Sequence, residues 1–122
     1  MKRVALAMML AAMAGPASAE ELPPEAKQAV IDSIKDRLFD GESARWRWPE
    51  KVEGASVYCG FLSSKNRFGA YTGFKPFAVM LAQGTKGWAS APLIVGDTDD
   101  AETVAREMCA ERGYALAMIP PE

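Results

Sequence analysis

Between Gly54 and Gly96 the chain contains no acidic residue, although Asp and Glu are frequent on both sides of this stretch. Asp and Glu are depleted in β-strands, whereas the β-branched and aromatic residues that recur here are enriched in them. This distribution favours a central block of strands between two segments of a different kind. A second interpretation stays open, a surface for an anionic partner, because the stretch keeps four basic residues: Lys65, Arg67, Lys75 and Lys86.

The segment from Pro24 to Phe39 is predicted to be a helix. Pro23 and Pro24 suit its first turn, where a missing N–H costs nothing, and Asp40-Gly41 is expected to end it. Its apolar residues recur at helical spacing: Val30, Ile31, Ile34 and Leu38.

A second helix is predicted to follow the acidic run of residues 97–100. Asp99 is the expected N-cap, with Glu102 three residues later as in a capping box, and Gly113 suits the end. One apolar stripe lies between them: Ala101, Val104, Ala105, Met108 and Cys109. The acidic run does not match a calcium loop, because the required glycine and distal glutamate are misplaced.

Strands are predicted from the apolar patterns elsewhere. They cover residues 44–48, 57–62, 74–81, 88–95 and 114–119, with turns at 63–73 and 83–87. Pro76 argues that the third strand begins at an edge or bulge. The order α-β-β-β-β-α-β predicts an α+β fold, an antiparallel sheet of about four to five strands with two helices on one face.

The first residues have the features of a secretory signal peptide. Lys2 and Arg3 precede an apolar run over residues 4–14, Gly15-Pro16 follows, and Ala17-Ser18-Ala19 supplies small residues for cleavage. We expect cleavage after Ala19, leaving residues 20–122 as a single small α+β domain in the periplasm or outside the cell, soluble and without a membrane span. The alternative is an N-terminal anchor or a buried helix.

Cys59 and Cys109 are the only cysteines. In an exported domain two cysteines allow one intramolecular disulfide, which would join the second predicted strand to the second predicted helix. The alternative is a pair of unpaired buried thiols.

Several chemistries find no support in the sequence. The chain has no histidine, which excludes imidazole-based nucleophile activation and the usual zinc and copper sites. Removing Lys2 and Arg3 from the 14 basic residues leaves 12 against 16 acidic ones, a net charge of −4, so nucleic-acid binding is not expected. We expect no metal, no cofactor and no catalytic site, with one alternative: a carboxylate pair drawn from Glu42, Glu50 and Glu53.

The turn after the second predicted strand combines aromatic side chains, cations and glycines. Such side chains on a loop can stack on sugars or pair with anions. The candidate binding residues are Lys65, Asn66, Arg67, Phe68, Tyr71 and Lys75. In the alternative interpretation the segment is a hairpin whose aromatic residues fill a small core.

Three segments resemble a family of short, uncharacterised exported proteobacterial proteins: Ser43–Arg47, Tyr58–Gly60 and Lys65–Phe74. Members of that family carry an S-A-x-F-R segment and a C-G-x-V-N-x-K-N-x-F-G-G-Y-x-G-F block. The chain departs from these patterns at Trp46, Ser63 and Ala70. The resemblance implies export and a shared fold, and it assigns no activity.

Taken together, the sequence predicts an exported, non-catalytic binding module for an envelope component, anionic in one interpretation, or for another protein. Two alternatives remain: a small carboxylate-dependent hydrolase of the cell envelope, and a structural accessory of an envelope assembly.

Overall fold

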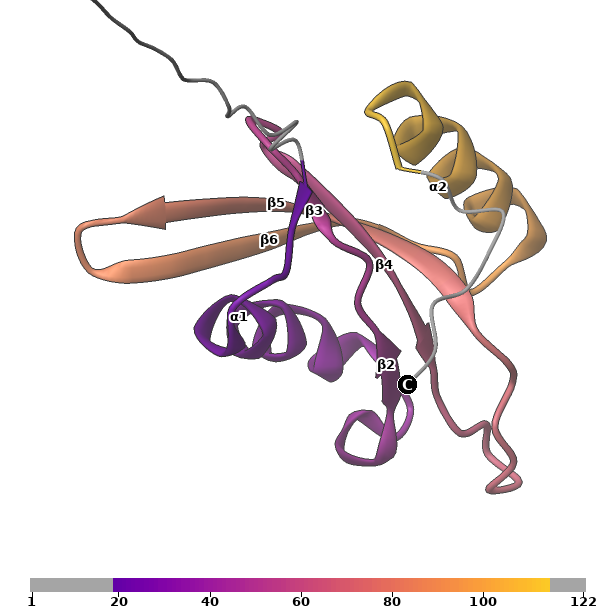
Figure 1. The fold of residues 1–122 in the computed structure, drawn as a ribbon. Helices are drawn as coiled ribbons and strands as arrows, with labels where there is room; N and C mark the ends of the chain where they lie inside the picture. The colour runs from indigo at the N-terminus through magenta and orange to yellow at the C-terminus, as the bar shows by residue number, and fades with distance from the viewer. Residues whose placement is uncertain (1–18, 115–122) are drawn as a thin grey trace, which may run out of the picture.

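A four-stranded antiparallel sheet lies at the centre of residues 19–114, the part of the chain that the computed structural model describes (Figure 1). The strand order is β2-β4-β5-β6, and the strands are β2 (Arg45–Arg47), β4 (Val57–Ser63), β5 (Lys75–Gly84) and β6 (Gly87–Val95). A second, two-stranded sheet pairs β1 (Ala19–Glu20) with β3 (Lys51–Val52). The predicted α+β class and antiparallel sheet are confirmed.

The β5–β6 hairpin is the longest element of the sheet, and its far end extends well beyond β4 (Figure 1). Its two strands pair from Phe77 and Val95 to the tight turn between Gly84 and Gly87, where Gly87 has a φ of 112°. Pro76 lies in β5 opposite Phe61, and the pairing of β5 with β6 shifts register between Ala78 and Val79, so an irregularity of the predicted bulge kind lies two residues after Pro76.

Helix α1 (Pro24–Ile34) lies against the far part of this hairpin (Figure 1). Its buried residues Ala26, Val30 and Ile34 recur at helical spacing and face the core. The helix is shorter than predicted, because a 3-10 turn over Lys35–Arg37 follows it and the backbone is extended at Leu38.

Helix α2 (Asp99–Glu111) begins at a different cap from the predicted one. Thr98 is the N-cap, because its hydroxyl accepts a hydrogen bond from the amide of Ala101 at 3.1 Å. Asp99 is the first residue of the helix, where an acidic side chain is favoured by the helix dipole.

The two helices pack on opposite faces of the sheet, which corrects the prediction that both lie on one face. Side chains alternate between faces along a strand, and the register of β4, β5 and β6 puts Cys59 and Ser90 on opposite faces. Cys59 is bonded to Cys109 of α2, whereas the Ser90 hydroxyl lies 2.9 Å from that of Ser33 in α1. All seven residues of β4 are buried, so both faces of this strand need cover.

The predicted disulfide between Cys59 and Cys109 is present, with the two Cα atoms 6.1 Å apart. Both cysteines are fully buried, and the bond ties α2 to the central strand β4. The alternative of two unpaired thiols is thereby excluded.

The predicted signal peptide and the predicted strand at 114–119 lie mostly outside the described residues. Tyr114 is described and buried, and its hydroxyl donates to the carbonyl of Val57 at 3.0 Å. At the other end, Ala19 and Glu20 pair with Val52 and Lys51 in the small sheet. Within residues 19–114 no helix is long and apolar enough to span a membrane.

Candidate functional site

The connection between β4 and β5, from Ser64 to Phe74, is a structured hairpin loop, which we call the β4–β5 loop. Lys65 and Tyr71 form an isolated antiparallel bridge. The amide of Asn66 donates to the carbonyl of Ala70 at 2.8 Å, and the amide of Thr72 donates to the carbonyl of Ser64 at 3.1 Å. These backbone bonds hold both sides of the loop together up to its tip.

The side chain of Asn66 holds the tip of the loop through hydrogen bonds to its backbone. Its side-chain oxygen Oδ1 accepts two backbone hydrogen bonds, from the amide of Phe68 at 2.9 Å and from that of Ala70 at 3.1 Å. Its carbonyl also accepts from Gly69, whose φ of 81° favours glycine. Asn66 is therefore a turn-forming residue of the kind that closes a loop on its own backbone. This structural role differs from the binding role predicted for it.

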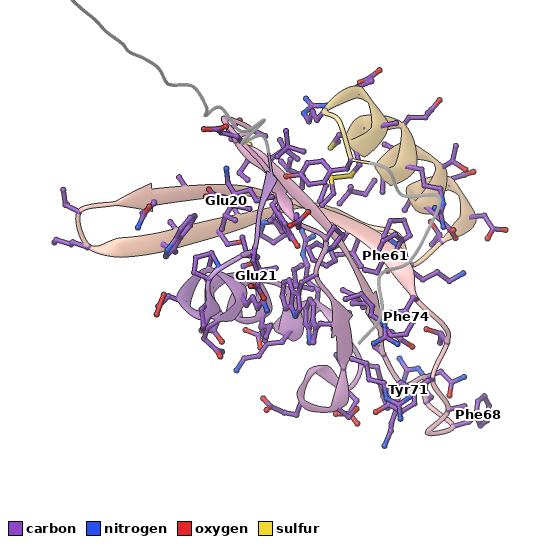
Figure 2. All side chains as sticks on the ribbon, in the orientation of Figure 1. Glu20, Glu21, Phe61, Phe68, Tyr71 and Phe74 are labelled. Atoms are coloured by element: carbon purple, nitrogen blue, oxygen red, sulfur yellow. A yellow bond between two sulfur atoms is a disulfide. The ribbon has the colours of Figure 1, made fainter. Side chains whose placement is uncertain are left out.

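Phe68 stands at the tip with 94% of its surface exposed, and Figure 2 shows its ring projecting away from the sheet. Arg67 lies beside it, with its guanidinium carbon 5.2 Å from the centre of the Phe39 ring. Phe39 is itself 62% exposed. The tip thus presents two aromatic rings and a cation to solvent, and we call Phe39, Arg67 and Phe68 the tip cluster.

Below the tip, cations from β2 stack on aromatic rings of the loop. The guanidinium carbon of Arg45 lies 3.8 Å from the centre of the Tyr71 ring, and that of Arg47 lies 4.4 Å from the centre of the Phe74 ring. The hydroxyl of Tyr71 donates to the carbonyl of Ser43 at 2.8 Å. These contacts fix the loop against β2, and Figure 2 shows Tyr71 and Phe74 on the body side of the loop.

Arg45, Arg47 and Phe39 also belong to this surface, although none of them is among the predicted binding residues. The alternation in Arg45-Trp46-Arg47-Trp48 indicates that the two arginines share one face of the strand and the two tryptophans the other, since alternate residues of a strand point to opposite faces. Trp46 and Trp48 stack with ring centres 5.4 Å apart, and Trp46 also packs against Phe77 of the core.

A pocket of about 180 Å³ opens beside the base of the loop. Its lining combines apolar side chains with charged and polar ones: Leu38, Leu62, Val95, Ser64, Lys65, Asn66, Thr72, Lys75 and Asp97. Of the predicted binding residues, the pocket brings together Lys65, Asn66 and Lys75, whereas Arg67 and Phe68 belong to the tip.

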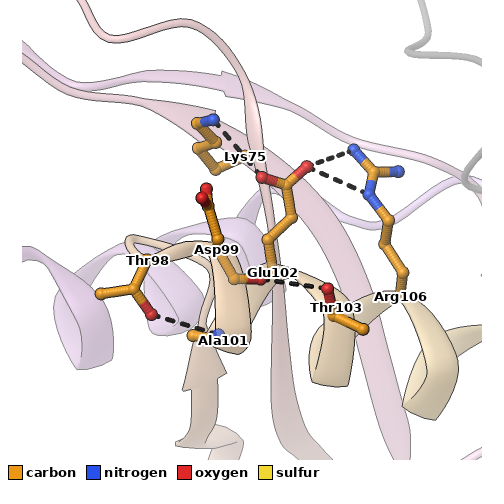
Figure 3. A network of polar contacts seen from close by, with 7 residues as sticks. All are labelled: Lys75, Thr98, Asp99, Ala101, Glu102, Thr103 and Arg106. Carbon is orange, nitrogen blue, oxygen red and sulfur yellow. Dashed lines mark hydrogen bonds and ion pairs between the residues drawn. The ribbon is translucent and has the colours of Figure 1, made fainter.

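Lys75 joins an ionic network with helix α2 (Figure 3). Its ammonium nitrogen lies 3.3 Å from Oε1 of Glu102, and Arg106 donates to Oε2 of the same carboxylate at 2.8 Å. The hydrogen bond from Arg106, together with Lys75, holds the pKa of Glu102 below its usual range. Lys75 therefore couples the base of the loop to α2.

The carboxylates considered for hydrolysis are surface residues. Glu42, Glu50 and Glu53 are all exposed, and Glu42 forms an ion pair with Lys35 at 3.6 Å. Among the residues described, no group of three or more Cys, Asp or Glu side chains is arranged to hold a metal ion.

Comparison with known proteins adds no assignment. No family model matches the sequence, and no match was found among curated proteins or solved structures. The resemblance to the exported proteobacterial family therefore stays a prediction.

Proposed function

We propose that this protein is an exported, non-catalytic binding module that recognises an anionic partner in the cell envelope through the tip of its β4–β5 loop. The supporting observation is an aromatic residue, Phe68, that is 94% exposed on a loop held by its own hydrogen bonds. Single exposed apolar residues are common, but this one is presented together with a cation and a second ring.

The chemistry of the tip suits recognition more than stability. Aromatic residues, phenylalanine included, and arginine are enriched at protein interfaces relative to the rest of the surface. The loop is already ordered by Asn66 and Tyr71, so binding would cost less conformational entropy than ordering a flexible segment. Export to the envelope follows from the signal-peptide pattern of residues 1–19 and belongs to the same proposal.

The charges of the loop and of β2 indicate the charge of the partner. The loop and the adjoining strand β2 carry Lys65, Arg67, Arg45 and Arg47, and the loop contains no acidic residue. Complementary charge accelerates encounter and disfavours partners of the same sign, and its effect weakens with salt. An anionic partner is therefore favoured although the chain as a whole is acidic.

The test is affinity capture from envelope extract with the double variant Arg67→Ser/Phe68→Ser, which leaves Asn66 in place. Lys86→Ser is the matched control, because Lys86 lies in the tight turn of the other hairpin and is also an exposed cation. We expect partner recovery to fall in the double variant and to persist in the control, with the melting temperature of both unchanged. Equal recovery with all three proteins would rule the tip out.

A further inference from the structure

We propose that the pocket beside the β4–β5 loop binds a free α-amino acid with an apolar side chain. Its carboxylate would lie between Lys65 and Lys75, its ammonium group would face Asp97, and its side chain would rest on Leu38, Leu62 and Val95. This site is separate from the tip cluster, and it does not depend on the function proposed above.

The size of the pocket limits the ligand. A volume of about 180 Å³ corresponds to about six water molecules and lies below the range typical of pockets for drug-sized ligands. The pocket is bounded by the ends of β4 and β6, by the start of β5 and by Leu38, which follows α1. Four segments distant in the sequence thus converge on a space of amino-acid size.

The lining separates apolar from charged groups. Leu38, Leu62 and Val95 provide apolar surface, and Leu62 and Val95 belong to the sheet itself. A pocket that is mostly apolar, with a few convergent polar groups, is the usual form of a small-molecule site. The apolar part would accept a hydrocarbon side chain.

The charges of the pocket favour a ligand that carries both signs. Lys65 and Lys75 are cationic and Asp97 is anionic. A simple anion would meet the carboxylate of Asp97, a simple cation would meet two ammonium groups, and a neutral hydrocarbon would leave Lys65 and Asp97 without a counter-charge. A zwitterion with an apolar side chain matches the three charged and the three apolar side chains of the lining.

The three charged groups are able to take part. An ammonium group has three donors, so Lys75 can hold Glu102 at 3.3 Å and still donate to a ligand. Lys65 lies 5.5 Å from the centre of the Tyr71 ring, a contact that leaves its donors usable. Asp97 forms no ion pair with any residue from 19 to 114.

The test is titration of the exported chain with leucine, followed by NMR chemical shifts of the pocket amides and by calorimetry. Two analogues serve as matched probes: N-acetylleucine, which lacks the ammonium group, and leucinamide, which lacks the carboxylate. We expect leucine to bind at millimolar concentration or below and both analogues to bind more weakly, by up to about fivefold, because a partly exposed charge pair is worth up to about 1 kcal/mol.

Variants then assign each charge. Asp97→Asn should weaken the binding of leucine but not that of N-acetylleucine. Lys65→Gln should weaken the binding of leucine but not that of leucinamide. Lys86→Gln should leave the affinity for all three ligands unchanged. The tip variant Arg67→Ser/Phe68→Ser should leave leucine binding unchanged, which separates this site from the tip. Absence of any shift at the pocket amides, or equal affinity for leucine and both analogues, would overturn the proposal.

Discussion

The guanidinium group of Arg45 stacks on the ring of Tyr71, with 3.8 Å between the guanidinium carbon and the ring centre. The contact joins the edge strand β2 to the β4–β5 loop, together with the hydrogen bond from Tyr71 to the carbonyl of Ser43 and the stacking of Arg47 on Phe74. Because β2 is three residues long, this pair is a main anchor of both segments.

Replacing Tyr71 with Leu should lower the free energy of unfolding by about 1–2 kcal/mol, through loss of the hydrogen bond and of the stacked cation. Phe68→Leu is the control, because an exposed ring should change stability by less than about 0.5 kcal/mol. Urea denaturation measures both. Hydrogen exchange of the backbone amides should also become faster in the β4–β5 loop of the Tyr71→Leu variant. Unchanged exchange would show that Tyr71 does not anchor the loop.

Asn66→Ala should destabilise the protein by about 1–2 kcal/mol, because the amides of Phe68 and Ala70 lose their acceptor. Asn66→Asp keeps an acceptor oxygen and should recover most of this loss. Arg67→Ala, one position further along, is expected to stay within about 0.5 kcal/mol of the wild type. Thermal denaturation of the three variants distinguishes a turn residue from a binding residue, and a silent Asn66→Ala would contradict the structural role.

Removal of the disulfide by Cys59→Ala/Cys109→Ala should lower the free energy of unfolding by about 4 kcal/mol, the chain-entropy estimate for a closed loop of 50 residues. Both sulfur atoms are buried, so reduction of the wild type should be slow without denaturant. Thiol labelling with and without denaturant checks access, and denaturation in the oxidised and reduced states checks stability. Rapid labelling of the native protein would be inconsistent with the buried bond.

Glu102 should make stability depend on pH in the acid range. Since its pKa is lower in the folded state, the carboxylate stabilises the fold above its unfolded-state pKa of about 4.3, and this contribution disappears as pH falls through the folded-state value. Glu102→Gln should therefore be less stable than wild type at pH 7, with the difference shrinking toward pH 3. Glu107→Gln, an exposed neighbour on α2, is the control. Denaturation curves at pH 7, 5 and 3 provide the comparison, and a difference that is constant with pH would exclude the ionic contribution.

The elements of the fold were largely predictable because their signals are local. Helical spacing of Val30 and Ile34 marks α1, and the stripe ending at Cys109 marks α2. The cap was misplaced by one residue, because Thr98 and Asp99 are both good N-caps and only the backbone path selects between them. The largely apolar sequence of β4 also indicated that both faces of this strand are buried.

The sequence by itself determined the antiparallel α+β class, the single disulfide and the loop on which aromatic and basic residues gather, since each follows from residue types and spacing along the chain. Only the tertiary structure decided that the helices cover opposite faces and that Lys75 joins Asp97 at one pocket. These relationships depend on strand register and on contacts between residues far apart in the chain. No local pattern encodes them, because a shift of register by one residue would send every side chain of a strand to the other face.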